Sequence, residues 1–153
     1  MVQDVNIGEF LRQGGVYHDI EGSTVEEVFD DICKKINLPS EISAESLYKA
    51  LITRESRLST AVGNGVSIPH AQQPILKDFY NQRIYVCYLK NPIEMHALDN
   101  KKIKVMIVIL TSSVKSHLHI ISMLARLLQK AEFKRALELQ SKLEDIYKIV
   151  RKI

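Results

Sequence analysis

One short segment of this 153-residue chain, residues 54–71, concentrates the side chains and backbone features that chemistry requires. It reads Arg-Glu-Ser-Arg-Leu-Ser-Thr-Ala-Val-Gly-Asn-Gly-Val-Ser-Ile-Pro-His-Ala. Pro69 fixes its own φ and favours an extended residue before it, so His70 is presented in a defined direction. A neutral imidazole nitrogen can attack a phosphoryl group near neutral pH, and the resulting N–P bond stays labile enough to pass the group onward. His70 is therefore a candidate phosphoryl acceptor.

A phosphoryl site also needs positive donors around its oxygens. Arg54 can supply a planar, permanently charged guanidinium. His117 stands near the expected start of a later helix, where amide dipoles and a second imidazole would meet an anion. The tripeptide Gly63-Asn64-Gly65 permits positive φ, so its amides could form an anion-binding nest, although a simple turn is the plainer interpretation.

Other chemistries find less support in the sequence. His117 and His119, together with His70 or His96, suggest a metal site, but residues two apart on a helix point about 200° apart. We therefore expect neither a metal nor a cofactor. Ser59 with His70 suggests a hydrolase, yet the chain has no Gly-x-Ser-x-Gly elbow. It has no P-loop either, so ATP is not the expected phosphoryl donor.

Hydrophobic periodicity predicts the elements that must position these residues. The expected helices cover residues 6–12, 23–36, 43–55, about 116–129 and two short segments after 130. The expected strands cover residues 16–20, 66–68, 84–89 and 103–110, with a shorter piece near 93–95. The Ser-x-x-Glu spacing predicts that Ser23 and Ser141 are N-caps, and Ser43 can cap the helix that follows it. Residues 56–74 are otherwise a loop.

Helices that bracket a small, very apolar sheet indicate an α/β domain. The strand at 103–110 is apolar except for Lys104, which predicts burial on both faces. We assign the apolar face of the helix near residues 116–129 to Leu118, Ile121, Leu124, Ala125 and Leu128. His117 shares one side of that helix with Leu124, so its imidazole would sit at the mouth of a buried face.

Length and composition are those of one globular domain spanning residues 1–153, with 46% hydrophobic and 25% charged residues. The longest uncharged apolar run, residues 105–110, is too short to span a bilayer, and residues 1–10 do not resemble a signal sequence. Cys33 and Cys87 have no motif spacing, which favours free thiols in a reducing compartment. We expect a cytoplasmic protein that does not insert into a membrane.

Charge is distributed unevenly along the chain. Residues 1–31 carry eight acids and one base, net −7, whereas residues 32–153 carry ten acids and twenty bases, net +10. Two solvated faces are the plain interpretation, and attraction of an acidic protein partner is the alternative. The basic residues are scattered and not clustered beside aromatic residues, so nucleic-acid binding is not expected.

The 54–71 segment resembles the active-site signature of the phosphotransferase-system enzyme IIA domains of the fructose, mannitol and nitrogen-regulatory type. The run Asp99-Asn100-Lys101-Lys102-Ile103 resembles the strand entry of that family, and Ser116-His117-Leu118 resembles the start of its histidine helix. The similarity covers nearly the whole chain and is greatest to a standalone nitrogen-regulatory type. The family fold, a mixed and mostly parallel sheet of about five strands flanked by helices, agrees with the α/β fold expected from periodicity.

The resemblance implies that His70 accepts a phosphoryl group from a phosphohistidine on a small HPr-like carrier, with Arg54 and His117 stabilising it. Residues matching the positions that shape the active-site loop are Glu55, Thr60, Gly63, Asn64 and Gly65. The implied role is mainly regulatory, through phosphorylation-dependent binding of target proteins. One alternative is a sugar-transport component that passes the group to an enzyme IIB. Another is an interaction domain whose histidine is not phosphorylated.

The sequence departs from the family pattern at four places. Ala61 stands where glycine is usual, Ser67 where alanine is common and Asn100 where glycine is common. Lys115-Ser116 replaces a site at which an acid often precedes the helix histidine. Ala61 would restrict the loop if its position needs positive φ, and the missing acid would change the charge presented to partners. None of these departures removes a phosphoryl ligand.

Overall fold

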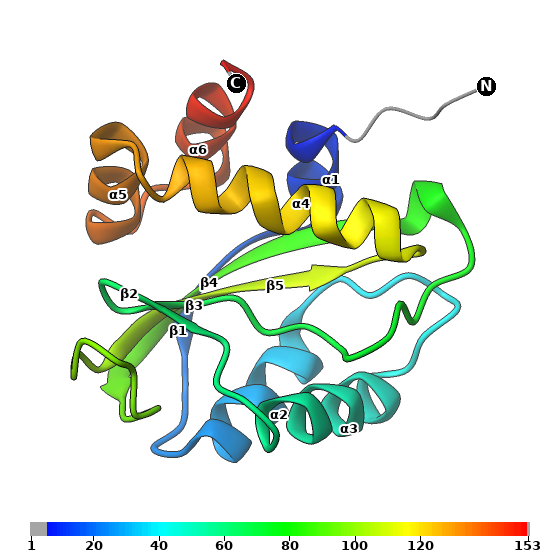
Figure 1. The fold of residues 1–153 in the computed structure, drawn as a ribbon, viewed down its shortest axis with the longest axis horizontal. Coiled ribbons are helices and arrows are strands. Elements are labelled where there is room, and N and C mark those ends of the chain that lie inside the picture. The colour runs from blue at the N-terminus through cyan, green and yellow to red at the C-terminus, as the bar shows by residue number, and fades with distance from the viewer. Residues whose placement is uncertain (1–5, 153) are drawn as a thin grey trace.

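The computed structural model describes residues 6–152, and Figure 1 shows a sheet between two layers of helices. The strands are β1 (Gly15–Ile20), β2 (Ala61–Gly63), β3 (Val66–Ser67), β4 (Arg83–Ile93) and β5 (Ile103–Leu110). The helices are α1 (Ile7–Gly14), α2 (Val25–Lys35), α3 (Ala44–Glu55), α4 (Val114–Leu127), α5 (Ala131–Glu138) and α6 (Leu143–Val150), with a 3-10 turn η1 (Phe79–Asn81). The α/β fold predicted from the sequence is confirmed. Residues 1–5, half of the stretch that was compared with a signal sequence, lie outside the described range.

The strands lie in the order β1-β4-β5-β3-β2. Parallel pairs join β1 to β4 and β3 to β5, whereas β4 with β5 and β2 with β3 are antiparallel. The predicted mixed sheet of five strands is confirmed, but the expectation of mostly parallel pairing is wrong. The direct connection over residues 94–102 returns β5 antiparallel to β4, whereas parallel β1 and β4 are separated by a crossover that contains α2 and α3.

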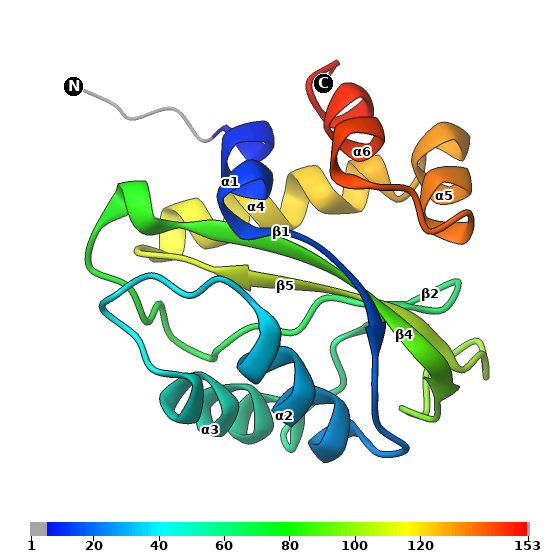
Figure 2. The same ribbon diagram turned by 180° about the vertical axis from the view of Figure 1, so that it is seen from behind.

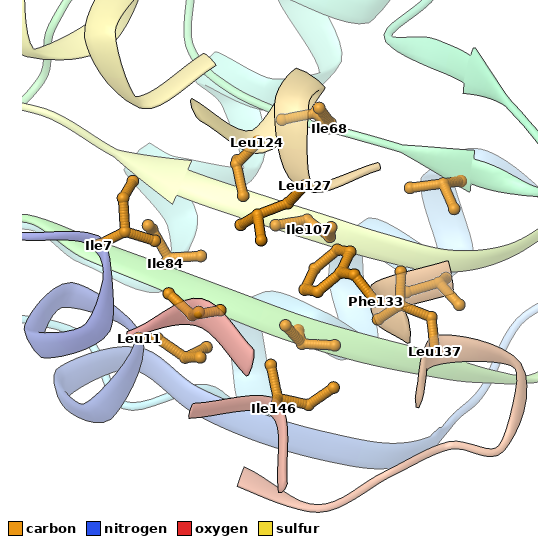
Figure 3. Close-up of a cluster of buried hydrophobic side chains, with 14 of the residues drawn as sticks. Ile7, Leu11, Ile68, Ile84, Ile107, Leu124, Leu127, Phe133, Leu137 and Ile146 are labelled. Atoms are coloured by element: carbon orange, nitrogen blue, oxygen red, sulfur yellow. The ribbon is translucent and has the colours of Figure 1, made fainter. Parts of the chain in front are cut away.

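Helices cover both faces of the sheet and create two apolar cores. α1, α4, α5 and α6 lie on one face, and α2 and α3 lie on the other (Figures 1 and 2). The first core, shown in Figure 3, includes Leu11, Ile107, Leu124, Phe133 and Ile146. The second includes Phe29, Ile32, Leu47, Leu51 and Met106. Within residues 6–152, no helix combines the length and apolar character needed to cross a bilayer.

The central strand β5 is buried on both faces, as its apolar sequence predicts. Side chains alternate between the two cores along the strand: Val105, Ile107 and Ile109 belong to the first core, and Met106, Val108 and Leu110 belong to the second. Because β5 packs against both cores, the positions of its two ends are well determined, and so are the starting points of the loops that follow them.

Two predicted N-caps are displaced in the structure. Thr24, not Ser23, caps α2, because the Thr24 side chain accepts a hydrogen bond from the amide of Glu27. The acid of this capping pair is therefore Glu27, whose carboxylate accepts from the amide of Ser23. Ser141 does not cap α6, which begins after Lys142 without a side-chain cap. Ser43 caps α3 as predicted, through the amide of Ser46.

The strand boundaries differ from the prediction in two places. β4 continues to Ile93, and residues 94 and 95 are not in a strand, so the separate short strand expected near residues 93–95 is absent. The extended piece predicted at 66–68 is β3, and it is paired with an additional strand, β2, that periodicity did not predict. A strand of three residues is too short to display a repeating pattern, which explains why β2 was missed.

The buried face of α4 is formed by Ile120, Leu124 and Leu127, which are spaced four and then three residues apart. Leu118 was assigned to this face, but it is 63% exposed. Residues two positions apart on a helix point about 200° apart, so Leu118 and Ile120 cannot face the same core. The prediction erred because both faces of the first two turns carry apolar residues, and sequence alone does not show which face contacts the sheet.

Candidate active site

His70 lies three residues after the end of β3, and the intervening segment runs alongside β5 toward its carboxyl end. The amide of Ile68 donates to the carbonyl of Thr60 at 3.0 Å, and the amide of Ile109 donates to the carbonyl of Pro69 at 3.2 Å. These bonds continue the β3 alignment beyond its last paired residue. His70 therefore emerges half-buried beside the carboxyl end of β5.

The His70 ring is oriented by its own backbone. Its Nδ1 lies 2.7 Å from the carbonyl oxygen of Ile68. A carbonyl oxygen can only accept, so Nδ1 must carry the hydrogen that makes this bond. In the neutral ring, Nε2 is then the nitrogen with the free lone pair. The geometry leaves Nε2 as the nucleophilic atom.

His117 is brought to His70 by the first turn of α4. Ser113 caps the helix by accepting from the amide of Ser116 at 3.1 Å, and its carbonyl accepts from the amide of His117. The two imidazole centroids are 4.8 Å apart, with the ring planes inclined at 58°. His117 Nδ1 also lies 3.4 Å from the hydroxyl of Thr111. Two histidines that are 47 positions apart in the sequence thus form one site.

Arg54 approaches the same site from the last turn of α3. One of its terminal nitrogens donates to the carbonyl of Leu58, which turns the chain back after the helix. The Arg54 charge lowers the pKa of both His70 and His117, so its guanidinium is close enough to act on each ring. His70 and His117 are therefore neighbours, Arg54 lies near enough for its charge to reach both rings, and the role of the three residues stays a prediction.

Burial keeps both rings neutral near pH 7. The pKa of His70 is lowered, first because burial disfavours the charged ring and then because of Arg54, although the Ile68 carbonyl and Glu55 act in the opposite direction. Burial, His70 and Arg54 lower the pKa of His117 to about 4. A neutral imidazole retains its lone pair, so the rings are suited to act as nucleophiles and not as positively charged groups.

Glu55 and Thr60 close the loop that follows α3. The Glu55 carboxylate accepts from the Thr60 amide at 2.8 Å and from the Thr60 hydroxyl at 2.6 Å. Thr60 is buried and its carbonyl accepts from Ile68, so this contact links the end of α3 to the strand that carries His70. The structure gives both residues a positioning role between Arg54 and His70.

The structure does not bring Gly63, Asn64 and Gly65 to His70. All three have positive φ, as expected, but they form the turn between β2 and β3. The Gly65 carbonyl accepts from the amides of Lys104 and Val105 at the start of β5, whereas His70 lies at its end. Four residues, 66–69, lie between Gly65 and His70, and the five residue steps of an extended chain span about 16 Å.

The nest predicted from these residues is consequently not a phosphoryl site. The amide of Asn64 donates at 2.8 Å to a carboxylate oxygen of Asp99. That side chain also accepts from the amide of Lys101, and the two bonds lower the pKa of Asp99. The amide that would meet an external anion is thus occupied by an internal one, and the three residues shape a hairpin remote from His70.

The departures from the family pattern fit the backbone. Ala61 lies in β2 and is absent from the residues with positive φ between positions 6 and 152, so its methyl group imposes no strain there. Asn100 has φ of 61°, a left-handed conformation that asparagine tolerates well among non-glycine residues. Among residues 6–152, no group of three or more His, Cys, Asp or Glu side chains is placed to hold a metal ion.

Sequence reasoning missed two features of the site. Gln82 is fully buried and its side-chain oxygen accepts from the amide of Ser112 at 2.9 Å, which fixes the turn leading into α4. Nothing in the sequence marks Gln82, since its partner is 30 residues away. The second feature is a group of exposed aliphatic side chains near the histidines. They are Leu58, Val114 and Leu118, which are 70%, 58% and 63% exposed.

Comparison with known sequences identifies this arrangement. The sequence profile of the phosphoenolpyruvate-dependent sugar phosphotransferase system EIIA 2 family matches residues 9–153. The chain belongs to this family. The resemblance recognised in residues 54–71 is therefore confirmed, and the chain is a phosphotransferase-system IIA component with the fold of that family.

Relatives of this IIA chain include both regulatory and transport proteins. The nitrogen regulatory protein of Pseudomonas aeruginosa is 26% identical over 150 residues, covering 95% of each chain. The fructose-specific EIIABC component of Bacillus subtilis is 27% identical over 144 residues, covering 92% of this chain and 22% of that protein. The crystal structure of the nitrogen regulatory protein IIA-Ntr of Neisseria meningitidis has a TM-score of 0.79 at 24% identity, covering 94% of this chain and 98% of that one.

Proposed function

We propose that this IIA protein carries a phosphoryl group on Nε2 of His70, received from a phosphohistidine of an HPr-like protein. The observation that carries the proposal is the 2.7 Å contact between His70 Nδ1 and the Ile68 carbonyl, which leaves Nε2 as the free nucleophile. Nε2 attacks phosphorus and forms a new N–P bond. The N–P bond of the donor breaks, and the donor nitrogen keeps the electron pair, so the group passes directly from one imidazole to the other.

Arg54 and His117 stabilise the transferred group in this mechanism. The guanidinium of Arg54 offers a permanent charge to the phosphoryl oxygens. We assign the Thr111 hydroxyl, which lies 3.4 Å from Nδ1 of His117, as the donor in that contact. The opposite ring nitrogen of His117 then carries a hydrogen that can be donated to a phosphoryl oxygen. His117 acts as a neutral donor because its pKa is about 4.

The surface around the site suits a protein partner. Exposed Val114 and Leu118 lie at the start of α4, which also supplies His117, and exposed Leu58 lies in the loop after α3, which supplies Arg54. Exposed apolar residues next to a reactive group are typical of a surface that docks another protein, because they are shielded from water in the complex. We infer that residues 1–153 act as one domain, in the cytoplasm, and that the phosphoryl donor docks here.

A regulatory output is the form of this function that we favour. Its support is the similarity, over 95% of each chain, to a protein named as a nitrogen regulator. The phosphorylated and free forms of His70 would then differ in affinity for target proteins. The fructose-specific relative supports the alternative, in which the group passes onward to an enzyme IIB during sugar transport.

Intact-protein mass spectrometry after incubation with phosphoenolpyruvate, enzyme I and HPr tests the proposal. We expect one acid-labile phosphoryl adduct on the native protein and none on His70→Ala. The matched control is His119→Ala, which alters an exposed histidine on α4 and should leave the adduct unchanged. Absence of an adduct on the native chain, with HPr itself phosphorylated, would favour the interaction domain that needs no phosphorylation.

A second experiment separates the two outputs. Phosphorylated protein is mixed with a fructose-specific IIB domain, and transfer is followed by the loss of the His70 adduct. Slow or absent transfer agrees with regulation. Rapid, stoichiometric transfer to the IIB cysteine would overturn the regulatory preference and assign the chain to transport.

A further inference from the structure

A second recess lies at the end of the molecule away from His70. It is a cavity of about 880 Å³ between the β2–β3 hairpin, the start of β5 and helix α5. Figures 1 and 2 both show α5 and β2 at the same end of the sheet. This volume falls within the range of pockets that enclose small molecules, roughly 300 to 1,000 Å³. The proposed phosphoryl transfer makes no use of this recess.

The recess is strongly basic. Its lining includes Lys101, Lys102, Lys104, Lys134 and Arg135, whereas its single carboxylate is that of Glu138. Within residues 6–152, none of these five cations takes part in an ion pair. Like charges gathered around a concave surface raise the local potential and attract an anion. The residual positive charge is therefore available to a ligand.

The recess also has an apolar component. Val62, Val66, Leu128 and Leu137 contribute to its lining from the hairpin, from the end of α4 and from α5. Gly65 lets the hairpin approach the entry to β5 closely, because a Cβ atom there would lie 3.3 Å from the carbonyl oxygen of Lys102. A ligand that fits both parts of the lining has an apolar or aromatic body as well as negative charge.

Hydrogen bonds between the hairpin and the segment that enters β5 hold the walls of the recess in place. Asp99 accepts hydrogen bonds from the amides of Asn64 and Lys101, which fixes the hairpin turn against the entry to β5. The Gly65 carbonyl accepts from the amide of Lys104 at 2.8 Å. Such bonds exist without a ligand, so the site is formed in advance and binding costs little reorganisation.

We propose that this recess binds a phosphorylated small molecule with an aromatic or apolar body, in the size class of a nucleoside diphosphate. The five cations would surround the phosphate groups, and the aliphatic lining would contact the body. This inference does not depend on phosphorylation of His70. The volume of the recess is that of a small-molecule site, whereas an acidic protein segment would need a longer surface.

Isothermal titration calorimetry of the full chain tests the proposal with ADP, inorganic pyrophosphate and adenosine as probes. We expect ADP to bind more tightly than either fragment, and higher salt to weaken the binding. The double variant Lys104→Glu/Lys134→Glu should weaken ADP binding by about tenfold or more. Lys148→Glu changes the charge of an exposed residue on α6 by the same amount per site, and it should leave the affinity for ADP unchanged.

Several results would overturn the inference. These are no saturable ADP binding, equal ADP affinity in the double variant, or pyrophosphate binding as tightly as ADP. Binding of a polyglutamate peptide without binding of ADP would assign the recess to an acidic protein partner instead. If the double variant does not fold, Lys102→Gln/Arg135→Gln replaces it, because both residues are exposed and glutamine removes the charge while keeping an amide donor.

Discussion

The carbonyl of Ile68 lies 2.7 Å from His70 Nδ1, and this contact determines which ring nitrogen is free. Pro69 contributes by limiting the backbone on either side of the bond, so ring and carbonyl stay aligned. Burial then lowers the pKa of the ring, which preserves the free lone pair at neutral pH. The reactivity of one residue thus depends on its own backbone and on the elements that bury it.

Arg54→Ala should slow phosphoryl transfer to His70 by about a hundredfold or more, because it removes the permanent charge from the phosphoryl oxygens. The free energy of unfolding should change little, since Arg54 is half-exposed and its main contact is with a loop carbonyl. Single-turnover transfer from phosphorylated HPr measures the rate. Arg57→Ala is the control, because Arg57 lies one turn further on and is exposed. Equal rates for the two variants would reject the role of Arg54.

The lowered pKa of His117 predicts how stability depends on pH. The folded ring stays neutral to about pH 4, while an unfolded histidine binds a proton near pH 6.5. Between these values the unfolded state holds more protons, so the native protein loses stability as pH falls through this window. One proton accounts for at most about 1.4 kcal/mol per pH unit.

Urea unfolding at several pH values between these limits measures the effect. His117→Gln should reduce the loss of stability on acidification, whereas His119→Gln, an exposed change on the same helix, should not. A pH dependence that is the same in the native protein and His117→Gln would contradict the assignment. NMR of the imidazole ring offers a direct check, since His117 should titrate well below the ordinary histidine range.

At the scale of elements, two helix ends and one strand end build the site. The carboxyl end of α3 supplies Arg54, the amino end of α4 supplies His117, and the strand continued by Ile68 supplies His70. The contact between Glu55 and Thr60 ties the first of these elements to the third. The site therefore combines several elements whose relative positions are set by the two cores.

The two faces of α4 should respond differently to truncation. Leu124→Ala removes a fully packed side chain from the first core and should cost about 2–5 kcal/mol of unfolding free energy. Leu118→Ala alters an exposed residue, so stability should change by less than about 0.5 kcal/mol while transfer from HPr becomes slower. Chemical denaturation and transfer kinetics, measured on both variants, separate the two roles. A large stability loss in Leu118→Ala would contradict the face assignment.

At the scale of the whole molecule, β5 connects the candidate active site to the basic recess. The basic recess adjoins its first residues, and His70 and His117 lie beyond its last. Lys104 and Leu110 are six residue steps apart along the strand, which corresponds to about 20 Å. Since β5 is packed on both faces, it holds the two regions at a fixed separation.

This separation predicts that the two regions act independently in binding and transfer. Substitutions more than about 10 Å apart without shared partners usually have additive effects. Lys104→Glu/Lys134→Glu should therefore leave the initial rate of His70 phosphorylation within about twofold, and Arg54→Ala should leave ADP affinity unchanged. The measurement is a double-mutant cycle that combines the recess and Arg54 changes. Strong non-additivity would instead indicate coupling through β5.

Local sequence features determined much of this fold. Residues 105–110 are all apolar, and successive residues of a strand point to opposite faces, so this strand requires a core on each side of the sheet. The capping residue Ser43 and the breaks at glycine and proline placed most element boundaries. Residues 54–71, with Pro69 before His70, made His70 the candidate phosphoryl acceptor and indicated the family to which the chain belongs.

Only the tertiary structure decided which of these residues meet. Gly63, Asn64 and Gly65 are nearer to His70 in sequence than Arg54 or His117, yet an extended strand carries them to the opposite end of the sheet. His117 is far away in sequence but returns to His70 because β5 leads directly into α4. The direction of strand β4 relative to β5 and the buried side of α4 were settled in the same way. Sequence records local conformational preference, whereas contact between distant residues depends on how the sheet and helices bury their apolar faces together.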